Sequence, residues 1–482
     1  MSELNSEADL VAVRPEADDP SGKLPIGASA WAIFEGARNP YVILVTIYIF
    51  APYLVSVMIG NAVKGQLLVS QWNTYSSLII MATAPFLGAS IDQLGRRKPW
   101  LILVVSAMVV MSFSLWWAKP DHTGLSVPGV LIILSVMGVL FPYSEVLHNS
   151  LLVRAAGLGK AHRASGLALA LGNASAVVAL GFTAWAFALP GLVDWYWVPH
   201  APLFGLDRVK HEPERIVAPM AAIIFALGAI PLFLFTPDAP STGVKVLKAF
   251  GDGAKSLLRM VLTVKDHKDA AIFLLARMFY VDGMTAILVY AGIYLGGVMK
   301  WGPLDLLIYG IILSAWAVFG GFVGRWLDAG LGPRRAVQVE ILMSLLGIIL
   351  FLGNSPDTIL YFWHFDAASH APLWGGPVFK TLPDIVMLLV GFSNATFITA
   401  HYASSRTLLT RLTPPEQTGA FFGVYALSGT ATLWLGNLMV NLGTRIFKTQ
   451  QGGFATIILL LAIGFTGLLF VRGGNRPAAR AG

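Results

Sequence analysis

Apolar residues form long continuous runs along this chain, and short polar segments separate the runs. Examples are 41–59, 101–117, 130–141, 221–235 and 457–471. The apolar positions do not alternate with polar ones, as they would in the strands of a membrane barrel, so the runs predict helices. About twenty such residues cross the hydrocarbon core of a bilayer, where a helix satisfies its own backbone groups. The expected fold class is an all-α integral membrane protein.

Twelve membrane-spanning helices are predicted from these runs. Their expected ranges are 36–60, 72–92, 99–118, 128–154, 164–189, 216–236, 270–298, 303–327, 335–353, 383–410, 417–443 and 452–472. Because twelve is an even number, both ends of the chain are expected on the same side of the membrane.

Composition excludes a soluble protein. Hydrophobic residues make up 56% of the chain and charged residues 12%, and the mean hydropathy is +0.69. The absence of cysteine excludes disulfides and thiolate metal sites, and no metal or other cofactor is expected. Residues 1–20 lack the basic and apolar regions of a cleaved signal peptide, so the first span is expected to direct insertion itself.

Basic residues lie in short segments between the predicted spans and do not form one patch, so the net charge of +7 does not indicate nucleic-acid binding. Most of them fall on one side of the spans, in 96–98, 154–163, 245–268, 325–335 and 472–480. The positive-inside rule assigns that side to the cytoplasm. We therefore expect a multi-pass protein of the plasma (inner) membrane with both termini cytoplasmic.

The longest charged segment between spans divides the chain into two halves of similar length. The expected organisation is a cytoplasmic segment 1–35, a six-helix bundle 36–236, a cytoplasmic linker 237–269, a second six-helix bundle 270–472 and a tail 473–482. A loop motif follows the second span of each half, as GASIDQLGRRK from residue 88 and GRWLDAGLGPRR from residue 324. Duplicated halves are typical of transporters that hold their solute near the midplane.

Two loops on the opposite side, 190–215 and 354–382, are longer than a helical bundle requires. They carry the aromatic residues Trp195, Tyr196 and Trp197, and Tyr361, Phe362 and Trp363. Such residues anchor proteins at the membrane interface, and a paired lid is the alternative interpretation.

Ionisable side chains inside a span cost about 2.5 to 3.5 kcal/mol each on insertion scales, so those that remain are candidates for function. Three predicted spans carry several polar groups each: Glu145, His148 and Asn149 in the fourth, Arg277, Tyr280 and Asp282 in the seventh, and Asn394, His401 and Ser405 in the tenth. Within each span they have helical spacing, except that Asp282 lies round the helix from Arg277 and Tyr280. At 1.5 Å per residue, Glu145 and Asp282 lie roughly 14 and 18 Å from the cytoplasmic ends of their spans. We expect these residues to bind the solute or couple its movement to another ion.

Structural interpretations of the same residues stay open. Glu145 and Arg277 could form an ion pair that holds the halves together, and His148 could be a hydrogen-bonded packing residue. At the cytoplasmic mouth of the first span lie Glu35, Arg38 and Asn39, where Glu35 and Arg38 have the i, i+3 spacing of a surface ion pair.

The first loop motif resembles the signature loop of the major facilitator superfamily between its second and third helices. That resemblance implies a major facilitator fold, a solute cavity lined by the first, fourth, seventh and tenth helices, and a cytoplasmic latch between the halves. The residues expected to form the latch are Gly88, Asp92, Gly95, Arg96 and Arg97, with Asp328 and Arg334 from the second copy.

Other segments are similar to the vacuole-effluxer group, which includes the "unknown major facilitator" transporters. They are the stretch from Trp31 to Asn39, the stretch from Arg277 to Gly283, Ser405-Arg406-Thr407 with Pro414-Pro415-Glu416, Phe421-Phe422-Gly423, and Leu427-Ser428-Gly429. Glu35 stands where the group usually has aspartate, and Arg38 and His401 also depart from its pattern. The fungal members are similar to amino-acid exporters of the vacuole, so the resemblance implies amino-acid efflux.

No nucleotide-binding loop and no His-Glu-x-x-His helix are found, so the chain is not expected to be an enzyme. We predict a secondary active transporter that moves a small solute, an amino acid or similar metabolite, by alternating access. Coupling to protons is left open. The alternative is a non-transporting membrane receptor or scaffold of the same fold. The expected partners are the small-molecule solute and the lipid bilayer, and the expected oligomeric state is a monomer.

Overall fold

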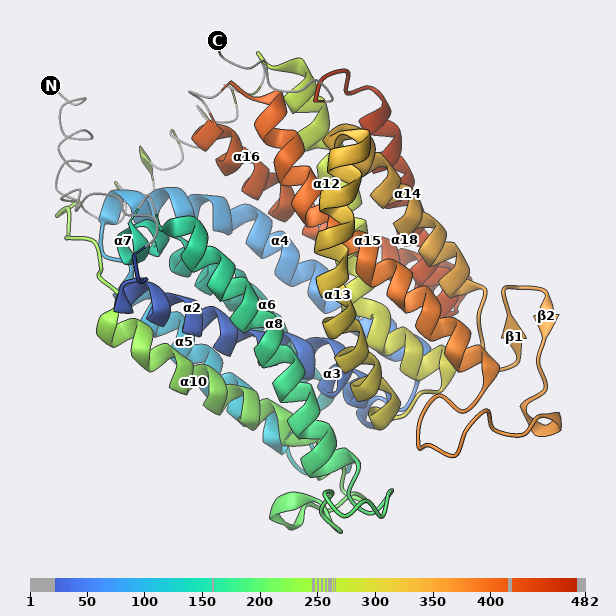
Figure 1. Ribbon diagram of the computed structural model, residues 1–482. Coiled ribbons are helices and arrows are strands. Elements are labelled where there is room, and N and C mark those ends of the chain that lie inside the picture. The colour runs from blue at the N-terminus through green and yellow to red at the C-terminus, as the bar shows by residue number, and fades with distance from the viewer. Residues whose placement is uncertain are drawn as a thin grey trace, which may run out of the picture.

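Two bundles of long helices lie side by side in the computed structural model, the N-terminal half coloured blue to green and the C-terminal half yellow to red (Figure 1). The structure describes residues 22–157, 160–244, 266–414 and 418–474, with isolated positions between 245 and 265. Eleven helices in the described part of the chain are long and apolar enough to cross a membrane. The predicted all-α membrane fold is confirmed. Most of the predicted linker and the two chain ends lie outside the described residues.

The N-terminal bundle supplies six spans, several of them built from consecutive helical segments. Its elements are α2 (Ile26–Pro40), η1 (Tyr41–Tyr48), α3 (Phe50–Tyr53), η2 (Leu54–Met58), α4 (Ala62–Leu94), α5 (Lys98–Ser114), η3 (Leu115–Trp117), α6 (Val127–Asn149), α7 (Leu152–Ala156), α8 (Ala161–Thr183), η4 (Ala184–Ala188), α9 (Glu212–Arg215) and α10 (Val217–Phe235).

The C-terminal bundle follows the linker. Its elements are α12 (Lys268–Tyr294), η6 (Leu295–Met299), α13 (Pro303–Leu331), α14 (Pro333–Leu352), α15 (Leu382–Leu412), α16 (Thr418–Thr430), α17 (Leu433–Phe447) and α18 (Gln450–Leu469). We call the side where α2 begins and α18 ends the terminal side, and the opposite side the loop side.

The two long loops on the loop side contain short elements only: η5 (Leu203–Gly205), β1 (Thr358–Ile359), β2 (Trp363–His364) and η7 (Ala367–Ser369). Strands β1 and β2 pair antiparallel, with Thr358 opposite His364. The six aromatic side chains expected in these loops are all exposed, as interface anchoring requires.

The first two spans begin about ten residues earlier than predicted. The first begins at Ile26 and not at 36, and the second at Ala62 and not at 72. Charged and amide side chains in these extra turns lower their hydropathy, but the structure supplies them with partners: Glu35 accepts a hydrogen bond from Arg38, and the buried Gln66 donates to Thr444. Pairing removes most of the penalty that the hydropathy of single residues implies.

Proline explains a second feature of the first span. Pro40 has no N–H, so the carbonyl of Gly36 lacks its usual helical donor. The Ser175 hydroxyl of α8 donates to this carbonyl at 2.6 Å. The irregular turns of η1 follow directly after Pro40.

The eleventh span, predicted as one helix over 417–443, is broken. Helix α16 ends at Thr430 and α17 begins at Leu433. The hydroxyl of Thr432, between them, donates to the carbonyl of Met278 in α12 at 2.6 Å. Helix α17 therefore starts anew inside the bundle, and its first amides face α12.

The bundles meet on the loop side. The described hydrogen bonds between them arise from the first half of α4, which begins on that side, and join Gln66 to Thr444 (2.7 Å), Ser70 to Asn441 (3.1 Å) and Ser77 to Asn437 (3.1 Å). Close backbone contact accompanies them: a Cβ on Gly292 of α12 would lie 2.0 Å from the carbonyl oxygen of Ile47. The structure is therefore closed between the bundles on the loop side, and Figure 1 shows the ribbons diverging toward the terminal side.

Candidate functional site

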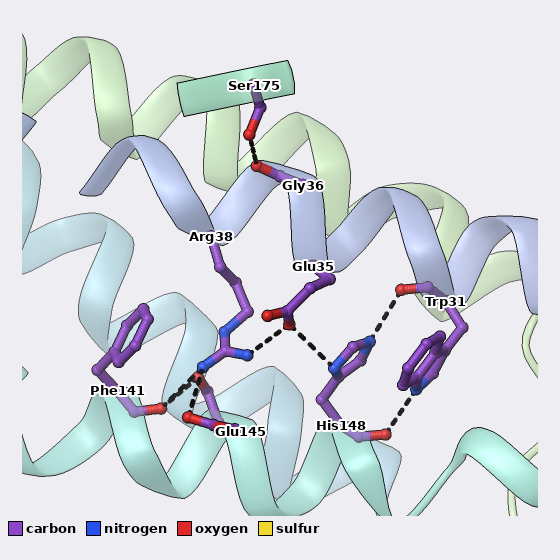
Figure 2. A network of polar contacts seen from close by, with 9 residues as sticks. Trp31, Glu35, Gly36, Arg38, Phe141, Glu145, His148 and Ser175 are labelled. Carbon is purple, nitrogen blue, oxygen red and sulfur yellow. Dashed lines mark hydrogen bonds and ion pairs between the residues drawn. The ribbon is translucent and has the colours of Figure 1, made fainter. Parts of the chain in front are cut away.

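A polar network joins α2 to α6 inside the N-terminal bundle (Figure 2). Trp31 and His148 stack with ring centroids 4.3 Å apart. Their hydrogen bonds are reciprocal: the Trp31 indole donates to the His148 carbonyl at 2.7 Å, and His148 Nε2 lies 2.8 Å from the Trp31 carbonyl. These contacts hold the His148 ring in one orientation and direct its Nδ1 toward Glu35, 3.5 Å away.

Arg38 is the centre of charge in this network. Its guanidinium lies 2.7 Å from Glu35 and 3.6 Å from Glu145, and it contacts both the ring and the carbonyl of Phe141. The side chain of Arg38 is only 2% exposed, whereas those of Glu35 and Glu145 are 37% and 54% exposed. A buried cation thus holds two carboxylates that remain accessible.

This geometry bears on two structural interpretations that the sequence left open. Arg38 and Glu35 do form an i, i+3 pair, but it lies about three turns inside α2 and not at the surface of the mouth. Glu145 pairs with Arg38 and not with Arg277, so the structural ion pair considered between the halves is absent from the described residues. The groups expected at the mouth and in the fourth span therefore form one cluster.

Arg277 occupies the corresponding place in the C-terminal bundle, on α12. One guanidinium nitrogen donates to the Tyr425 carbonyl at 2.8 Å and to the Ser428 hydroxyl at 2.7 Å. The guanidinium carbon lies 3.6 Å from the centre of the Tyr425 ring. Within the described part of the chain, no carboxylate lies in salt-bridge distance of Arg277, which is 6% exposed. Its charge is held by neutral groups only.

Two tenth-span residues on α15, His401 and Ser405, lie near Arg277 and its partner Tyr425. His401 packs edge-on against Tyr280 at 4.8 Å, and the Ser405 hydroxyl lies 2.5 Å from that of Tyr425. Both ring nitrogens of His401 and the hydroxyl of Tyr280 are buried without a hydrogen-bond partner in the described structure. Unsatisfied buried polar groups are costly, so this region has unused capacity to bind a polar ligand or water.

The break in the eleventh span places a hydrogen-bond donor beside Asp282. Its carboxylate accepts a 2.6 Å hydrogen bond from the amide of Gly436, in the first turn of α17. The start of a helix carries a partial positive charge, which stabilises a nearby anion. A Cβ on Gly436 would lie 2.8 Å from the carboxylate, so this approach needs glycine.

Three other candidates lie apart from these clusters. Asn149 is exposed, and Asn39 faces Gly172 of α8. Asn394 of α15 points toward α14, where a Cβ on Gly347 would lie 2.1 Å from its side-chain oxygen. Asn39 and Asn394 therefore pack against neighbouring helices at glycines.

The first latch loop is held by a residue that the sequence did not single out. Asp238, just after α10, accepts hydrogen bonds from the backbone amides of Arg97 and Lys98 at 2.9 and 3.1 Å and so caps α5. Gly95 has a φ of +84°, and a Cβ there would lie 2.1 Å from the carbonyl oxygen of Pro240. The side chain of Asp92, another expected latch residue, lies outside the described residues.

The other latch residues are spread over both bundles. Gly88 faces Val146 of α6 at 3.5 Å, and Arg96 is exposed. In the second copy Arg334 donates to the Arg472 carbonyl at 3.4 Å, and one carboxylate oxygen of Asp328 is buried without a hydrogen-bond partner. The side-chain hydrogen bonds from Arg97 to Gly95 and from Arg334 to Arg472 each stay within one bundle.

Several contributors were missed by the sequence reasoning: Phe141, Tyr425, Ser428, Gly436, Asp238 and the buried Glu340, whose carboxylate accepts a hydrogen bond from Ser404 at 2.8 Å. Ser428 belongs to a segment that carries the family resemblance, and that signal could have indicated it. Gly436 acts through its backbone amide and Phe141 in part through its backbone carbonyl, which residue type does not reveal.

The fold is similar to those of two solved transporters. The D-xylose–proton symporter matches with a TM-score of 0.63 and 13% identity over 92% of this chain and 96% of that chain. The nucleoside transporter NupG matches with a TM-score of 0.60 and 11% identity over 92% and 98%. An uncharacterized MFS-type transporter, YxiO of Bacillus subtilis (strain 168), is 21% identical over 464 residues, which is 92% of this chain and 94% of the relative.

Paired helical bundles and these matches give the chain the fold of major facilitator superfamily transporters. The family described as "Vacuole effluxer Atg22 like" matches residues 55–476. The chain belongs to this family, as its motifs predicted.

Proposed function

We propose that this chain is a secondary active transporter for a zwitterionic amino acid or similar metabolite. The observation that carries the proposal is Arg277, a buried cation that the described structure leaves without a carboxylate partner. An uncompensated charge in a low-dielectric interior is costly. A carboxylate on the solute would supply the missing counter-charge and form charge-assisted hydrogen bonds.

The opposite charge of the solute has a partner on the other bundle. Glu145 is more than half exposed, and its contact with Arg38 at 3.6 Å leaves its carboxylate free to bind an ammonium group. A solute held by Arg277 and Glu145 would bridge the two bundles, so its binding would favour their closure on the terminal side. Such bridging is the physical requirement of alternating access around a central site.

Proton coupling is the second part of the proposal. Glu145 lies 3.6 Å from Arg38 in this state. Closure of the terminal side would exclude water and replace Arg38 by the solute ammonium as the nearest cation. Release of that ammonium would leave an anion in a dry site, which favours uptake of a proton. Together with the family's effluxer description, this supports proton-driven export across the plasma membrane.

A thermal-stability screen of the purified full-length protein tests the proposed solute. A ligand that binds only the folded state stabilises it by about 2.7 kcal/mol at one hundred times its Kd. We expect free amino acids to raise the Tm, and expect the methyl ester and the deaminated analogue of the best one to have little effect. Stabilisation by neutral sugars or nucleosides, with none by amino acids, would contradict the proposal.

A further inference from the structure

A groove of about 530 Å³ lies between α12 and α18 on the terminal side, on the face of α12 away from Arg277. Its apolar walls come from both helices. They include Ile272, Leu275, Phe279, Ile463 and Phe470. Leu275 and Phe470 are 58% and 65% exposed, and both lie within or next to a membrane-length helix. The groove is thus open to hydrocarbon along its length.

Two cations stand at the terminal-side end of the groove. Lys268 is the first residue of α12, and Arg472 follows the end of α18. Both are exposed and line the groove. Asp269, the third charged residue there, has partners within the protein. Its carboxylate accepts hydrogen bonds from the backbone amides of Arg472 and Gly473 at 3.2 and 3.0 Å. Asp269 therefore fixes the end of α18 against the start of α12 and keeps Arg472 at the rim.

From this arrangement we propose that the groove binds an anionic phospholipid. The acyl chains lie along the apolar walls, and the phosphate lies between Lys268 and Arg472. The apolar walls end where the cations begin, so the groove matches the acyl chains and the phosphate of one phospholipid. Anionic lipids concentrate in the cytoplasmic leaflet and attract basic residues at its surface, and the terminal side is the predicted cytoplasmic side. The bound lipid joins the first helix after the linker to the last helix of the bundle.

Lipid retention by the full-length protein provides the test. The protein is placed in nanodiscs of phosphatidylcholine, and binding of added phosphatidylglycerol is measured by native mass spectrometry. Each cation near a membrane surface contributes roughly a fivefold gain in affinity. The double variant Lys268→Gln/Arg472→Gln should therefore bind phosphatidylglycerol roughly thirtyfold more weakly, while its binding of phosphatidylcholine stays unchanged.

Two further variants separate this site from a general effect of charge. Lys64→Gln/Arg445→Gln removes one exposed lysine and one exposed arginine on the loop side and should retain the affinity. Leu275→Trp fills the groove without a change of charge and should lose it. The proposal is overturned if the loop-side variant weakens binding as much as the groove variant, if Leu275→Trp binds normally, or if soluble glycerol phosphate at millimolar concentration displaces the lipid.

Discussion

At the scale of single residues, two of the three buried arginines in the described structure, Arg38 and Arg277, have different surroundings. Arg38 is neutralised by Glu35 and Glu145, so its burial needs no ligand. Arg277 has only a carbonyl, a hydroxyl and an aromatic ring around it. A cation–π contact contributes about 2 kcal/mol when desolvated, less than the several kcal/mol that burial of an ion costs. The difference makes Arg277 the stronger candidate for an anionic ligand.

Glu145 carries the prediction for coupling. Glu145→Gln removes the titratable group but keeps the shape and one hydrogen-bond acceptor toward Arg38. We expect solute exchange to continue in proteoliposomes, whereas accumulation driven by a proton gradient falls at least about tenfold, to the level seen without a gradient. Asp357→Asn, which changes an exposed loop carboxylate, should behave as the wild type. Gradient-driven accumulation in the Glu145→Gln protein at the wild-type level would refute proton coupling through this residue.

His148 shows how much of a residue's role can be predicted from the sequence. Its position on the fourth span and its spacing from Glu145 were readable from the sequence. Its stacking on Trp31 was not, because the two residues are 117 positions apart. The structure supports a hydrogen-bonded packing role for the ring, with Nδ1 left to face Glu35.

At the scale of elements, the break between α16 and α17 explains how a buried aspartate is tolerated. The hydropathy of 417–443 predicts one continuous helix, because hydropathy depends on residue type and gives no sign of a break in the backbone. The reason for the break is visible only in the structure: the buried Asp282 needs a hydrogen-bond donor, and the new N-terminus of α17 supplies the amide of Gly436. Sequence patterns located the span but could not show the hydrogen bond between Asp282 and Gly436, which are far apart in the sequence.

Gly436→Ala tests the role of this helix start. Alanine normally favours a helix over glycine, yet here its methyl group would lie 2.8 Å from the Asp282 carboxylate. We expect a loss of stability of roughly 1–3 kcal/mol, typical of overpacking, measured as a lower Tm. Gly321→Ala on α13, where a Cβ meets nothing within 4 Å, should lose no stability. Equal effects of the two substitutions would show that the contact with Asp282 is unimportant.

At the scale of the whole molecule, the described contacts between the bundles indicate a state that is closed on the loop side. Gly292 permits this closure because its backbone meets the carbonyl of Ile47. Gly292→Ala places a methyl group 2.0 Å from that oxygen and should shift the population toward the state open on the loop side.

Distances between spin labels on the two bundles would measure the shift. The expected result is a larger population with long loop-side distances than in the wild type. Gly181→Ala on α8 adds the same methyl group in open space and should leave the distribution unchanged. An unchanged distribution in the Gly292→Ala protein would mean that the bundles do not separate along this contact.

The orientation in the membrane is a separate prediction at this scale. It rests on the arginine and lysine asymmetry and on the even number of spans. Because the chain has no cysteine, a single introduced cysteine provides one labelling site. Tyr196→Cys places it in the long loop 190–215, and Lys23→Cys places it before α2. In intact cells a membrane-impermeant maleimide should label Tyr196→Cys, and should label Lys23→Cys only after permeabilisation. The reverse pattern would place the terminal side outside.

The sequence predicted the architecture well because periodic hydrophobicity, charge bias and the repeated loop are properties that a one-dimensional pattern contains. It located Arg277, Glu145 and Arg38 and paired Arg38 with Glu35, but it did not indicate that Glu145 also contacts Arg38. Partners are set by the packing of helices that are distant in sequence, and the pairing of Glu145 with Arg38 depends on the register of α2 against α6. The same limit applies to Asp238, whose capping of α5 connects residues about 140 positions apart.

The most direct test of the central claim is counterflow of a radiolabelled amino acid, the best ligand of the stability screen, in proteoliposomes without any ion gradient. Counterflow needs solute binding and alternating access but no coupling ion. We expect counterflow in the wild type and normal affinity in Arg445→Gln. Arg277→Gln should lose apparent affinity at least about thirtyfold, since removal of one partner of a buried charge pair costs about 2 kcal/mol or more. Wild-type affinity in the Arg277→Gln protein would contradict the central claim.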